Sequence, residues 1–274
     1  MVDVAEVTLA EISASQRQAI RSLKSWRRFH YRKRRGEPPL LAAVDRYPTS
    51  VFVAGCQRSG TTMLTRLVAH SAGFRSLRLT HDDELDAALV LCGEVNLSTD
   101  VRYCFQTTFL NERFQEYRKL GSQHRLVWIV RNPYSVVYSM VHNWSRFALN
   151  ELYAGCCGGA QQPTAIALEL GWPLGPTQIE KAARAYAAKT SQIFAILHLV
   201  ERHQVMVVHY DDLVREPRPL LERVFKFVGG TFREEYVAGV RSDSSGKAAA
   251  LSNNARHIVQ KFAEPTYQEC LTLI

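Results

Sequence analysis

The chain alternates between short strand-like runs and longer stretches whose apolar residues recur at helical spacing. Strands are expected at 50–54, 75–79, 103–105, 125–130 and 205–208. Helices are expected at 61–70, 85–91, 112–119, 135–144 and 179–202. The run at 125–130 is almost entirely apolar, as in parallel strands that are buried on both faces. Strands that alternate with helices imply crossover connections, so the pattern predicts a three-layer α/β/α fold with a central parallel sheet.

Length and composition are those of one folded domain. The chain has 274 residues, 46% hydrophobic and 22% charged, which is enough for one α/β core. We expect an N-terminal arm over 1–49 and one domain over 50–274, with a loop-rich insertion near 150–178. Within this insertion, 153–163 is rich in Gly and Cys and is expected to be loop. No run approaches the roughly eighteen apolar residues of a membrane span and no secretory signal is evident, so a cytoplasmic protein is expected.

Most of the net charge of +8 lies in the N-terminal arm, whose first 35 residues hold nine Lys or Arg and three Asp or Glu. Its apolar residues have loosely helical spacing, which predicts a basic amphipathic helix that ends near Gly36: Ile12, Ile20, Leu23, Trp26 and Phe29. Three uses of this helix remain open. It packs on the core with a solvated outer face, contacts an anionic surface, or attracts an anionic substrate. Nucleic-acid binding is not expected, because the arm contains no recognised module.

Six cysteines are scattered along the chain without a C-x-x-C pair or a histidine spacing typical of zinc sites. We expect reduced thiols and no metal. Cys56 lies in a glycine-bounded loop, where packing of a small residue is the expected role.

This loop joins a predicted strand to a predicted helix, over Val51 to Leu64. Such a turn directs backbone N–H groups at a phosphate. Gly55 and Gly60 have the spacing of the ATP-binding loop, but Thr61 takes the place of its lysine. The cation lies inside the loop instead, at Arg58, whose guanidinium can bind an oxyanion through two hydrogen bonds. The combination indicates a phosphate-bearing donor other than ATP.

Three segments between about 50 and 250 resemble the sulfotransferases that use 3′-phosphoadenosine 5′-phosphosulfate (PAPS). Gln57-Arg-Ser-Gly-Thr-Thr62 resembles the 5′-phosphosulfate loop, in the form found in tyrosylprotein-type and many bacterial members. The segment at 126–140, with Arg131-Asn-Pro and Ser139, is similar to the family's 3′-phosphate segment. The stretch from 205 to 229 resembles its late strand, Tyr-Glu-Asp-Leu turn and following helix. The resemblance implies the P-loop NTPase-like sulfotransferase fold.

The same resemblance implies transfer of a sulfuryl group from PAPS to a hydroxyl. The residues expected to bind the donor are Gln57, Arg58, Ser59, Gly60, Thr61, Thr62, Arg131, Ser139 and Lys247. Among them Arg58 is also expected to be catalytic, because it would stabilise charge on the leaving oxygen. Arg131 and Ser139 would hold the 3′-phosphate. Lys247 falls in a segment, 241–247, that is either the loop closing over the donor or a solvated loop.

The catalytic base is expected to be a carboxylate. The Lys-Thr-His of cytosolic sulfotransferases corresponds here to 106–108, which holds no imidazole. In tyrosylprotein-type enzymes a glutamate shortly after the first helix is the base, and Glu84 lies near that distance. A raised pKa would suit it to proton abstraction. The substitutes are Glu94, His81 and His142, and the alternative is that Glu84 and its neighbours only cap a helix.

Two other functions compete with this hypothesis. One is an ATP-dependent small-molecule kinase, for which Asp211 and Asp212 are the nearest candidates to hold Mg²⁺. The other is a non-catalytic binding protein that keeps the sulfotransferase fold. For the acceptor of a sulfotransferase, a carbohydrate or other small metabolite is favoured, because no segment for docking a protein substrate is evident.

Overall fold

The computed structural model describes residues 6–23, 25–33, 39–158, 175–240 and 246–274. At its centre is a six-stranded sheet in the order β1-β3-β4-β2-β5-β6. The strands are β1 (Glu6–Thr8), β2 (Val51–Gly55), β3 (Phe74–Arg78), β4 (Arg102–Gln106), β5 (Arg125–Val130) and β6 (Val205–His209). Every neighbouring pair of these strands is parallel. The predicted parallel sheet is confirmed.

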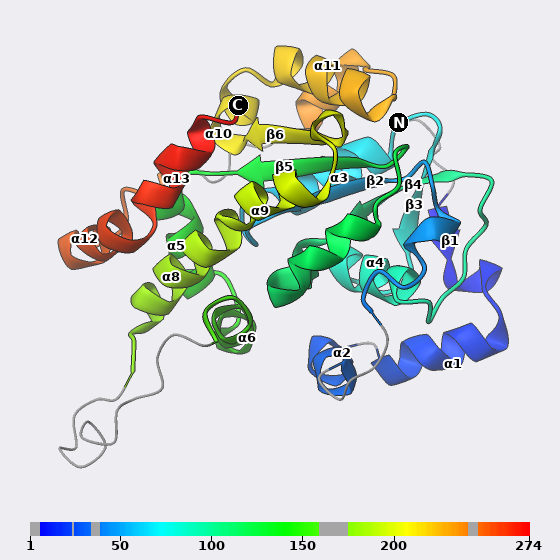
Figure 1. Ribbon diagram of the computed structural model, residues 1–274, viewed down its shortest axis with the longest axis horizontal. Coiled ribbons are helices and arrows are strands. Elements are labelled where there is room, and N and C mark those ends of the chain that lie inside the picture. The colour runs from blue at the N-terminus through cyan, green and yellow to red at the C-terminus, as the bar shows by residue number, and fades with distance from the viewer. Residues whose placement is uncertain (1–5, 24, 34–38, 159–174, 241–245) are drawn as a thin grey trace.

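Helices cover both faces of the sheet (Figure 1). Successive side chains of its buried strands point to opposite sides, so the strands contribute to a hydrophobic core on each face. Val51 and Val53 pack with α3 (Thr61–Ala69) and α11 (Pro217–Val228). Phe52 and Ala54 belong to the core of the opposite face. That face is covered by α4 (Asp83–Leu91), α8 (Gln178–Thr190), α9 (Gln192–Leu199), α13 (Glu264–Leu271) and the 3₁₀ segment η3 (Thr108–Lys119). The three-layer architecture is therefore confirmed.

The strand order places a topological switch point at β2. From β2 the chain builds β3 and β4 on one side of it and then crosses to build β5 and β6 on the other. In open parallel sheets, ligands bind in the crevice outside the carboxyl ends of the strands at such a point. The loop after β2, the segment after β4 and the Arg-Asn-Pro after β5 all lie at this edge.

Two of the helices expected after residue 50 differ in the structure. The segment at 112–119 belongs to η3, which is kinked at Asn111 with φ of 37°. The helix expected over 179–202 is divided into α8 and α9 at Ser191. The Ser191 hydroxyl donates to the Ala188 carbonyl at 3.1 Å, so a side chain competes for a backbone acceptor at this break.

The expected loop over 153–163 is wrong for its first part, because α6 (Arg146–Cys157) continues through Cys157. Ser145 caps this helix by accepting a hydrogen bond from the Ala148 N–H at 3.1 Å. Leu149 and Leu152 supply its buried face. Residues 159–163 lie outside the described part of the chain.

The N-terminal arm is joined to the domain. Its β1 pairs with β3 at the sheet edge. The expectation of one helix in the arm is wrong, because two helices follow β1, namely α1 (Ala14–Leu23) and α2 (Trp26–Lys33). Ile20, Leu23 and Phe29 are buried in the main core, as the first interpretation of the amphipathic pattern requires. The sequence did not indicate β1, since three residues are too few to show a period.

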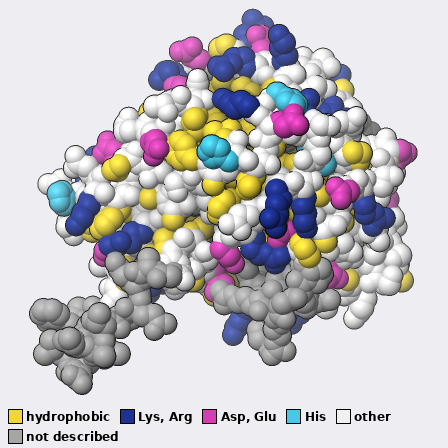
Figure 2. Space-filling model, in the orientation of Figure 1, with side chains coloured by type: hydrophobic (Ala, Val, Ile, Leu, Met, Phe, Trp, Pro, Cys, Tyr) yellow, Lys and Arg dark blue, Asp and Glu magenta, His cyan; other side chains and the backbone are white. Residues whose placement is uncertain are grey.

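The remaining α-helices of the described residues are α5 (Pro133–His142), α10 (Tyr210–Arg215) and α12 (Asn253–Phe262). None of the helices described here is long and apolar enough to cross a membrane. On the face shown in Figure 2, Lys and Arg side chains lie among Asp and Glu side chains, so both signs of charge are mixed there. All six cysteines are free thiols, and burial raises the pKa of Cys56, which suits its expected packing role.

Candidate functional site

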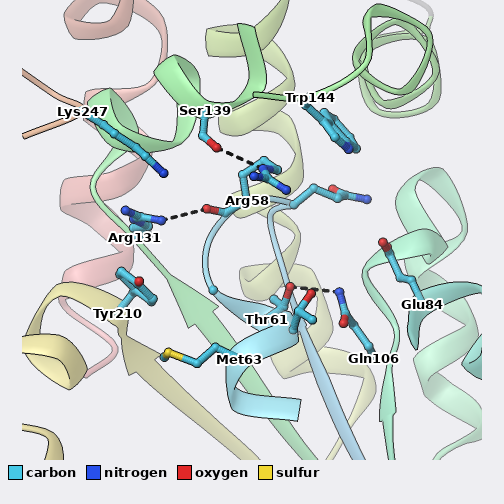
Figure 3. A pocket seen from close by; sticks show the side chains of 13 residues that line it. Arg58, Thr61, Met63, Glu84, Gln106, Arg131, Ser139, Trp144, Tyr210 and Lys247 are labelled. Atoms are coloured by element: carbon cyan, nitrogen blue, oxygen red, sulfur yellow. Dashed lines mark hydrogen bonds between the residues drawn. The ribbon is translucent and has the colours of Figure 1, made fainter. Parts of the chain in front are cut away.

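A cavity of about 310 Å³ lies at the carboxyl edge of the sheet (Figure 3). We call it the first cavity. Its described lining is Gln57, Arg58, Gly60, Thr61, Thr62, Met63, Glu84, Gln106, Arg131, Ser139, Trp144, Tyr210 and Lys247. Every residue expected to bind the donor or act in catalysis is on this wall except Ser59. The structure thus brings together residues from 57 to 247 that share no local sequence context.

The loop between β2 and α3 has the backbone geometry of an anion cradle. Gly60 is the N-cap of α3 with φ of 94°, and no described side chain caps the helix. The first intrahelical hydrogen bond is from the Leu64 N–H to the Gly60 carbonyl, so the N–H groups before Leu64 have no intrahelical acceptor. A Cβ at Gly60 would lie 2.3 Å from the Tyr210 ring. Glycine is therefore required there by conformation and by space.

Ser59 does not face the first cavity. Its side chain is fully buried, and its N–H donates to the Cys56 carbonyl at 3.2 Å. Thr61 is also buried, and its hydroxyl accepts a hydrogen bond from Gln106 Nε2 at 3.2 Å. Thr62 is exposed on the cavity wall. Because the Thr61 hydroxyl only accepts in its bond with Gln106, Thr61 and Thr62 both offer a hydroxyl hydrogen on the cavity wall.

Arg131 is buried in the wall and held from several sides. One guanidinium nitrogen donates to the Arg58 carbonyl at 3.1 Å, and the Tyr210 ring lies 4.2 Å from the guanidinium carbon. Its Nε is buried without a partner among the described residues. Burial lowers the pKa of Arg131, yet an arginine stays protonated. This cation is pre-positioned, and one of its donors still lacks an acceptor.

The backbone around Arg131 is fixed by three side chains. Tyr186 donates its hydroxyl hydrogen to the Arg131 carbonyl at 2.7 Å. The Asn132 N–H donates to Asp211 Oδ2 at 2.9 Å, while the Asn132 side chain caps α5 by accepting from the Tyr134 N–H. The sequence analysis did not assign Tyr186 and Tyr210 to the site. The signal for Tyr210 was present, because Tyr210-Asp-Asp-Leu213 is the part of this chain that resembles the family's Tyr-Glu-Asp-Leu turn.

Arg58 and Ser139 meet directly. The sequence assigned them to opposite ends of a donor, but Arg58 Nε donates to Ser139 Oγ at 3.0 Å. Arg58 has φ of 71°, an unusual value for a residue with a side chain. Figure 3 shows Lys247 and Arg131 on one side of Arg58 and Glu84 on the other. Arg58 therefore stands between the cationic end of the cavity and the carboxylate.

Glu84 lies in the first turn of α4 with its carboxylate on the cavity wall. It is not the cap of that helix, because Asp82 accepts the hydrogen bonds from the N–H groups of Glu84 and Leu85, each at 3.0 Å. Thr108 donates its hydroxyl hydrogen to Glu84. Burial raises the pKa of Glu84 from 4.5 to about 7, while the Thr108 hydrogen bond opposes this rise. A carboxylate with this pKa suits proton transfer near neutral pH.

The substitutes for Glu84 lie elsewhere. His81 is exposed and lines a separate cavity of about 330 Å³. His142 is exposed, and its ring lies 4.5 Å from that of Tyr138. Glu94 lies beyond the C-terminal end of α4, whereas Glu84 lies in the first turn of this helix. Glu84 is the member of this set that reaches the first cavity.

A second cavity, of about 200 Å³, adjoins the first and shares Gln57, Glu84 and Trp144 with it. The rest of its described lining is Trp26, Asp82, Phe109, Asn111, Ser145, Phe147, Ala148, Glu151 and Leu152. A third cavity, of about 450 Å³, shares Thr62 and Met63 with the first. Its other described lining is Arg66, Leu67, His70, Tyr236 and Gly239. Glu84 faces the second cavity and the start of α3 faces the third.

The two aspartates considered for Mg²⁺ have other partners. Asp211 accepts from the Asn132 N–H and lies 3.4 Å from His209 Nε2. Asp212 lies 2.9 Å from His209 Nδ1 and 2.5 Å from an Arg215 nitrogen. Asp211 thus ties α10 to the Arg-Asn-Pro turn, while Asp212 bonds only within the β6–α10 segment among the described residues.

The chain is similar in sequence to one protein family and in fold to a solved structure. The family model described as "sulfotransferase domain" matches residues 48–257. Among solved structures, the sulfotransferase domain of the Synechococcus PCC 7002 olefin synthase is similar, with a TM-score of 0.52, 15% identity and coverage of 78% of this chain and 94% of that chain. The sulfotransferase domain from the curacin biosynthetic pathway has a TM-score of 0.49 and 18% identity over 82% of this chain and 96% of that chain. Mouse sulfotransferase SULT7A1 complexed with PAP has a TM-score of 0.38 and 16% identity over 85% of this chain and 86% of that chain. No curated protein sequence matches the chain.

Proposed function

Since the chain belongs to the sulfotransferase domain family, we propose that it transfers the sulfuryl group of PAPS to the hydroxyl of a small metabolite, with Glu84 as the base. The observation that carries the proposal is the first cavity, which joins a phosphate loop, a buried arginine and a carboxylate of raised pKa. PAPS, when bound, supplies an activated sulfuryl group on its 5′-phosphate and a second phosphate at the 3′ position.

The residues at the cationic end fit such a donor. Arg131 has a buried donor that lacks a partner, and Ser139 and Lys247 line the same wall. We assign them to the 3′-phosphate. The uncapped N-terminus of α3, with Thr62 and Arg58, offers N–H, hydroxyl and guanidinium donors to the 5′ end.

The third cavity is suited to the adenine. Met63, Leu67 and Tyr236 give it apolar and aromatic surface. The Tyr236 hydroxyl is buried and has no partner among the described residues, so it is available to a ring nitrogen. The cavity adjoins the start of α3, where the 5′ end of the nucleotide would lie.

The chemistry requires a base and stabilisation of a leaving oxygen. Glu84 would accept the proton of the acceptor hydroxyl, since it lines both the first and the second cavity. Arg58 and the N–H groups at the start of α3 would stabilise the negative charge that develops on the bridging oxygen of the donor. The acceptor would enter through the second cavity, which places its hydroxyl on the Glu84 side.

An ATP-dependent kinase is the weaker hypothesis. Thr61 takes the position of the nucleotide-binding lysine, and its hydroxyl is engaged by Gln106. Asp211 and Asp212 are held by His209 and the Arg-Asn-Pro turn. A binding protein without catalysis would have no use for a carboxylate of raised pKa beside the phosphate loop.

The test is group transfer by the full chain. The protein is incubated with sulfur-labelled PAPS, and in parallel with phosphorus-labelled ATP, and with a panel of hydroxylated small molecules. We expect labelled product from PAPS alone, and loss of that product in Arg58→Ala and Glu84→Gln. Transfer from ATP, or full activity of both variants, would contradict the proposed function.

A further inference from the structure

The second cavity is built in part by the N-terminal arm. The family match begins at residue 48, whereas Trp26 belongs to α2 and lines this cavity. The Trp26 ring lies 6.0 Å from the ring of Phe109, which lines the same wall. Trp26 is only partly buried, so its ring packs on the core and still borders the cavity. A segment outside the matched domain therefore shapes the space next to Glu84.

Trp26 is also hydrogen-bonded to the turn that carries Glu84. Its Nε1–H donates to Asp82 Oδ2 at 2.7 Å. The other carboxylate oxygen of Asp82 accepts from the N–H groups of Glu84 and Leu85 and so fixes the first turn of α4. One aspartate thus links the indole of the arm to the backbone of the proposed base.

The wall of the second cavity carries four aromatic side chains, of Trp26, Phe109, Trp144 and Phe147. Phe147 is 44% exposed, which is unusual for a large apolar side chain in this protein. Four aromatic rings around a cavity of about 200 Å³ favour a flat ring as its ligand, through stacked and edge-to-face contacts.

Several polar groups on the same wall are already committed. Asp82 binds Trp26 and caps α4, and Ser145 caps α6. Gln57 Nε2 donates to the Thr108 carbonyl at 3.0 Å and to Asn111 Oδ1 at 3.2 Å. A sugar brings many hydroxyls that each lose water on binding, and buried hydroxyls without partners are costly. Gln57 Oε1 has no partner among the described residues and Ser145 keeps its hydroxyl hydrogen, so the wall can pair with a few hydroxyls of an acceptor. It therefore favours an acceptor with few hydroxyls over a sugar ring.

We propose that α2 forms part of the acceptor site. Trp26 selects a flat, ring-bearing alcohol with one or a few hydroxyls, and it holds Glu84 in place through Asp82. This inference rests on the function proposed above. It narrows the acceptor from small metabolites in general to compact ring alcohols. Trp26 acts on Glu84 as a positioning residue and on the acceptor as a direct contact.

The experiment compares acceptor kinetics of the full chain and its Trp26 variants, with 2-naphthol as the flat-ring probe and glucose as the sugar probe. We expect the wild-type protein to have a higher kcat/KM for 2-naphthol than for glucose. Trp26→Ala should raise the KM for 2-naphthol about tenfold or more, because it removes the stacking surface. Trp26→Phe keeps a ring but loses the N–H, so it should chiefly lower kcat. The control is Arg27→Ala, an exposed neighbour on α2, which should leave both parameters unchanged.

Affinity for adenosine 3′,5′-bisphosphate distinguishes a failure of the Trp26 proposal from a failure of the proposed function. It should stay within about twofold of wild type in all variants, which shows that the donor site is folded. If Trp26→Ala does not fold, the kcat of Trp26→Phe tests the positioning role. An unchanged kcat in Trp26→Phe overturns that role. A preference for glucose, or equal KM values in Trp26→Ala and Arg27→Ala, overturns the acceptor assignment. Absence of bisphosphate binding by wild-type protein would instead contradict the proposed function itself.

Discussion

The hydrogen bond from Thr108 to Glu84 gives the most specific prediction of the proposed mechanism. Burial raises the pKa of Glu84 from 4.5 to about 7, and the Thr108 hydroxyl limits this rise because it stabilises the ionised form. Thr108→Val removes the hydroxyl and keeps the volume of the side chain. We predict that the pKa of Glu84 increases in this variant and that the rate at neutral pH falls.

The magnitude follows from the strength of the lost hydrogen bond. A hydrogen bond to a charged group contributes about 1.5–3 kcal/mol, and one pKa unit corresponds to about 1.4 kcal/mol. The pKa should therefore rise by about one to two units. A base of pKa about 7 is half ionised at pH 7, whereas after this rise the ionised fraction there is about one tenth or less. Near pH 9 the variant should recover to about half of the wild-type rate or more.

The assay is single-turnover sulfuryl transfer from PAPS between about pH 5.5 and 9.5, with both substrates saturating, so that the profile reports the bound enzyme. Thr108→Ser retains the hydroxyl and serves as the control. The wild-type rate should rise about tenfold between pH 6 and 8. A flat wild-type profile over this range, or identical profiles for Thr108→Val and wild type, would refute the assignment of Glu84.

Three further predictions concern stability and donor binding. Because the folded pKa of Glu84 exceeds 4.5, ionising it costs stability as the pH rises through about 7; Glu84→Gln should therefore be more stable than wild type by about 1–3 kcal/mol at pH 8 and nearly equal to it at pH 4.5, in urea unfolding. Equal stability at both pH values would show that Glu84 is not buried with an uncompensated charge. Arg131→Ala should weaken the binding of adenosine 3′,5′-bisphosphate by about tenfold to a hundredfold and leave that of adenosine 5′-monophosphate within about threefold, by calorimetry; equal losses for both ligands would remove Arg131 from the 3′-phosphate site. Gly60→Ala should destabilise the protein more than Gly73→Ala, because both glycines have positive φ but only a Cβ at Gly60 would meet the Tyr210 ring, at 2.3 Å, whereas a Cβ at Gly73 meets nothing within 4 Å. Similar urea midpoints for the two variants would contradict the close approach of Tyr210.

The elements of the fold could be predicted where local sequence determines them. The strand at 125–130 is apolar enough to be buried on both faces, and the glycines at 55 and 60 mark a turn that needs positive φ. The two breaks in the predicted helices, at Asn111 and Ser191, are different, because they interrupt apolar patterns that are otherwise helical. Ser191 is one such case, where a hydroxyl takes a backbone acceptor in the middle of an apolar pattern.

The site could be predicted only as far as its residues belong to contiguous motifs. Arg58, Arg131 and Ser139 were found because the phosphate loop and the Arg-Asn-Pro segment are continuous in sequence. Tyr210 and Trp26 were not assigned to the site, since their roles come from packing across the sheet and from the arm. The contact of Arg58 with Ser139 was also not foreseen, because side-chain direction is not encoded in motif spacing.

The expectation of a carbohydrate or other small metabolite as the acceptor did not come from a sequence motif. It followed from the absence of a visible protein-docking segment and not from any residue of the site. The aromatic wall of the second cavity is formed by α2, η3 and the start of α6, which are distant in sequence. Only their spatial meeting indicates a flat ring.

The proposed function requires that one cavity recognise a nucleotide by phosphates at both its 3′ and 5′ positions. Titration calorimetry of the 274-residue chain with adenosine 3′,5′-bisphosphate and with adenosine 5′-monophosphate measures this recognition. We predict that the bisphosphate binds at least about tenfold more tightly, because Arg131, Ser139 and Lys247 provide charged and hydroxyl donors to the second phosphate. Equal affinity for the two nucleotides would contradict the proposed function.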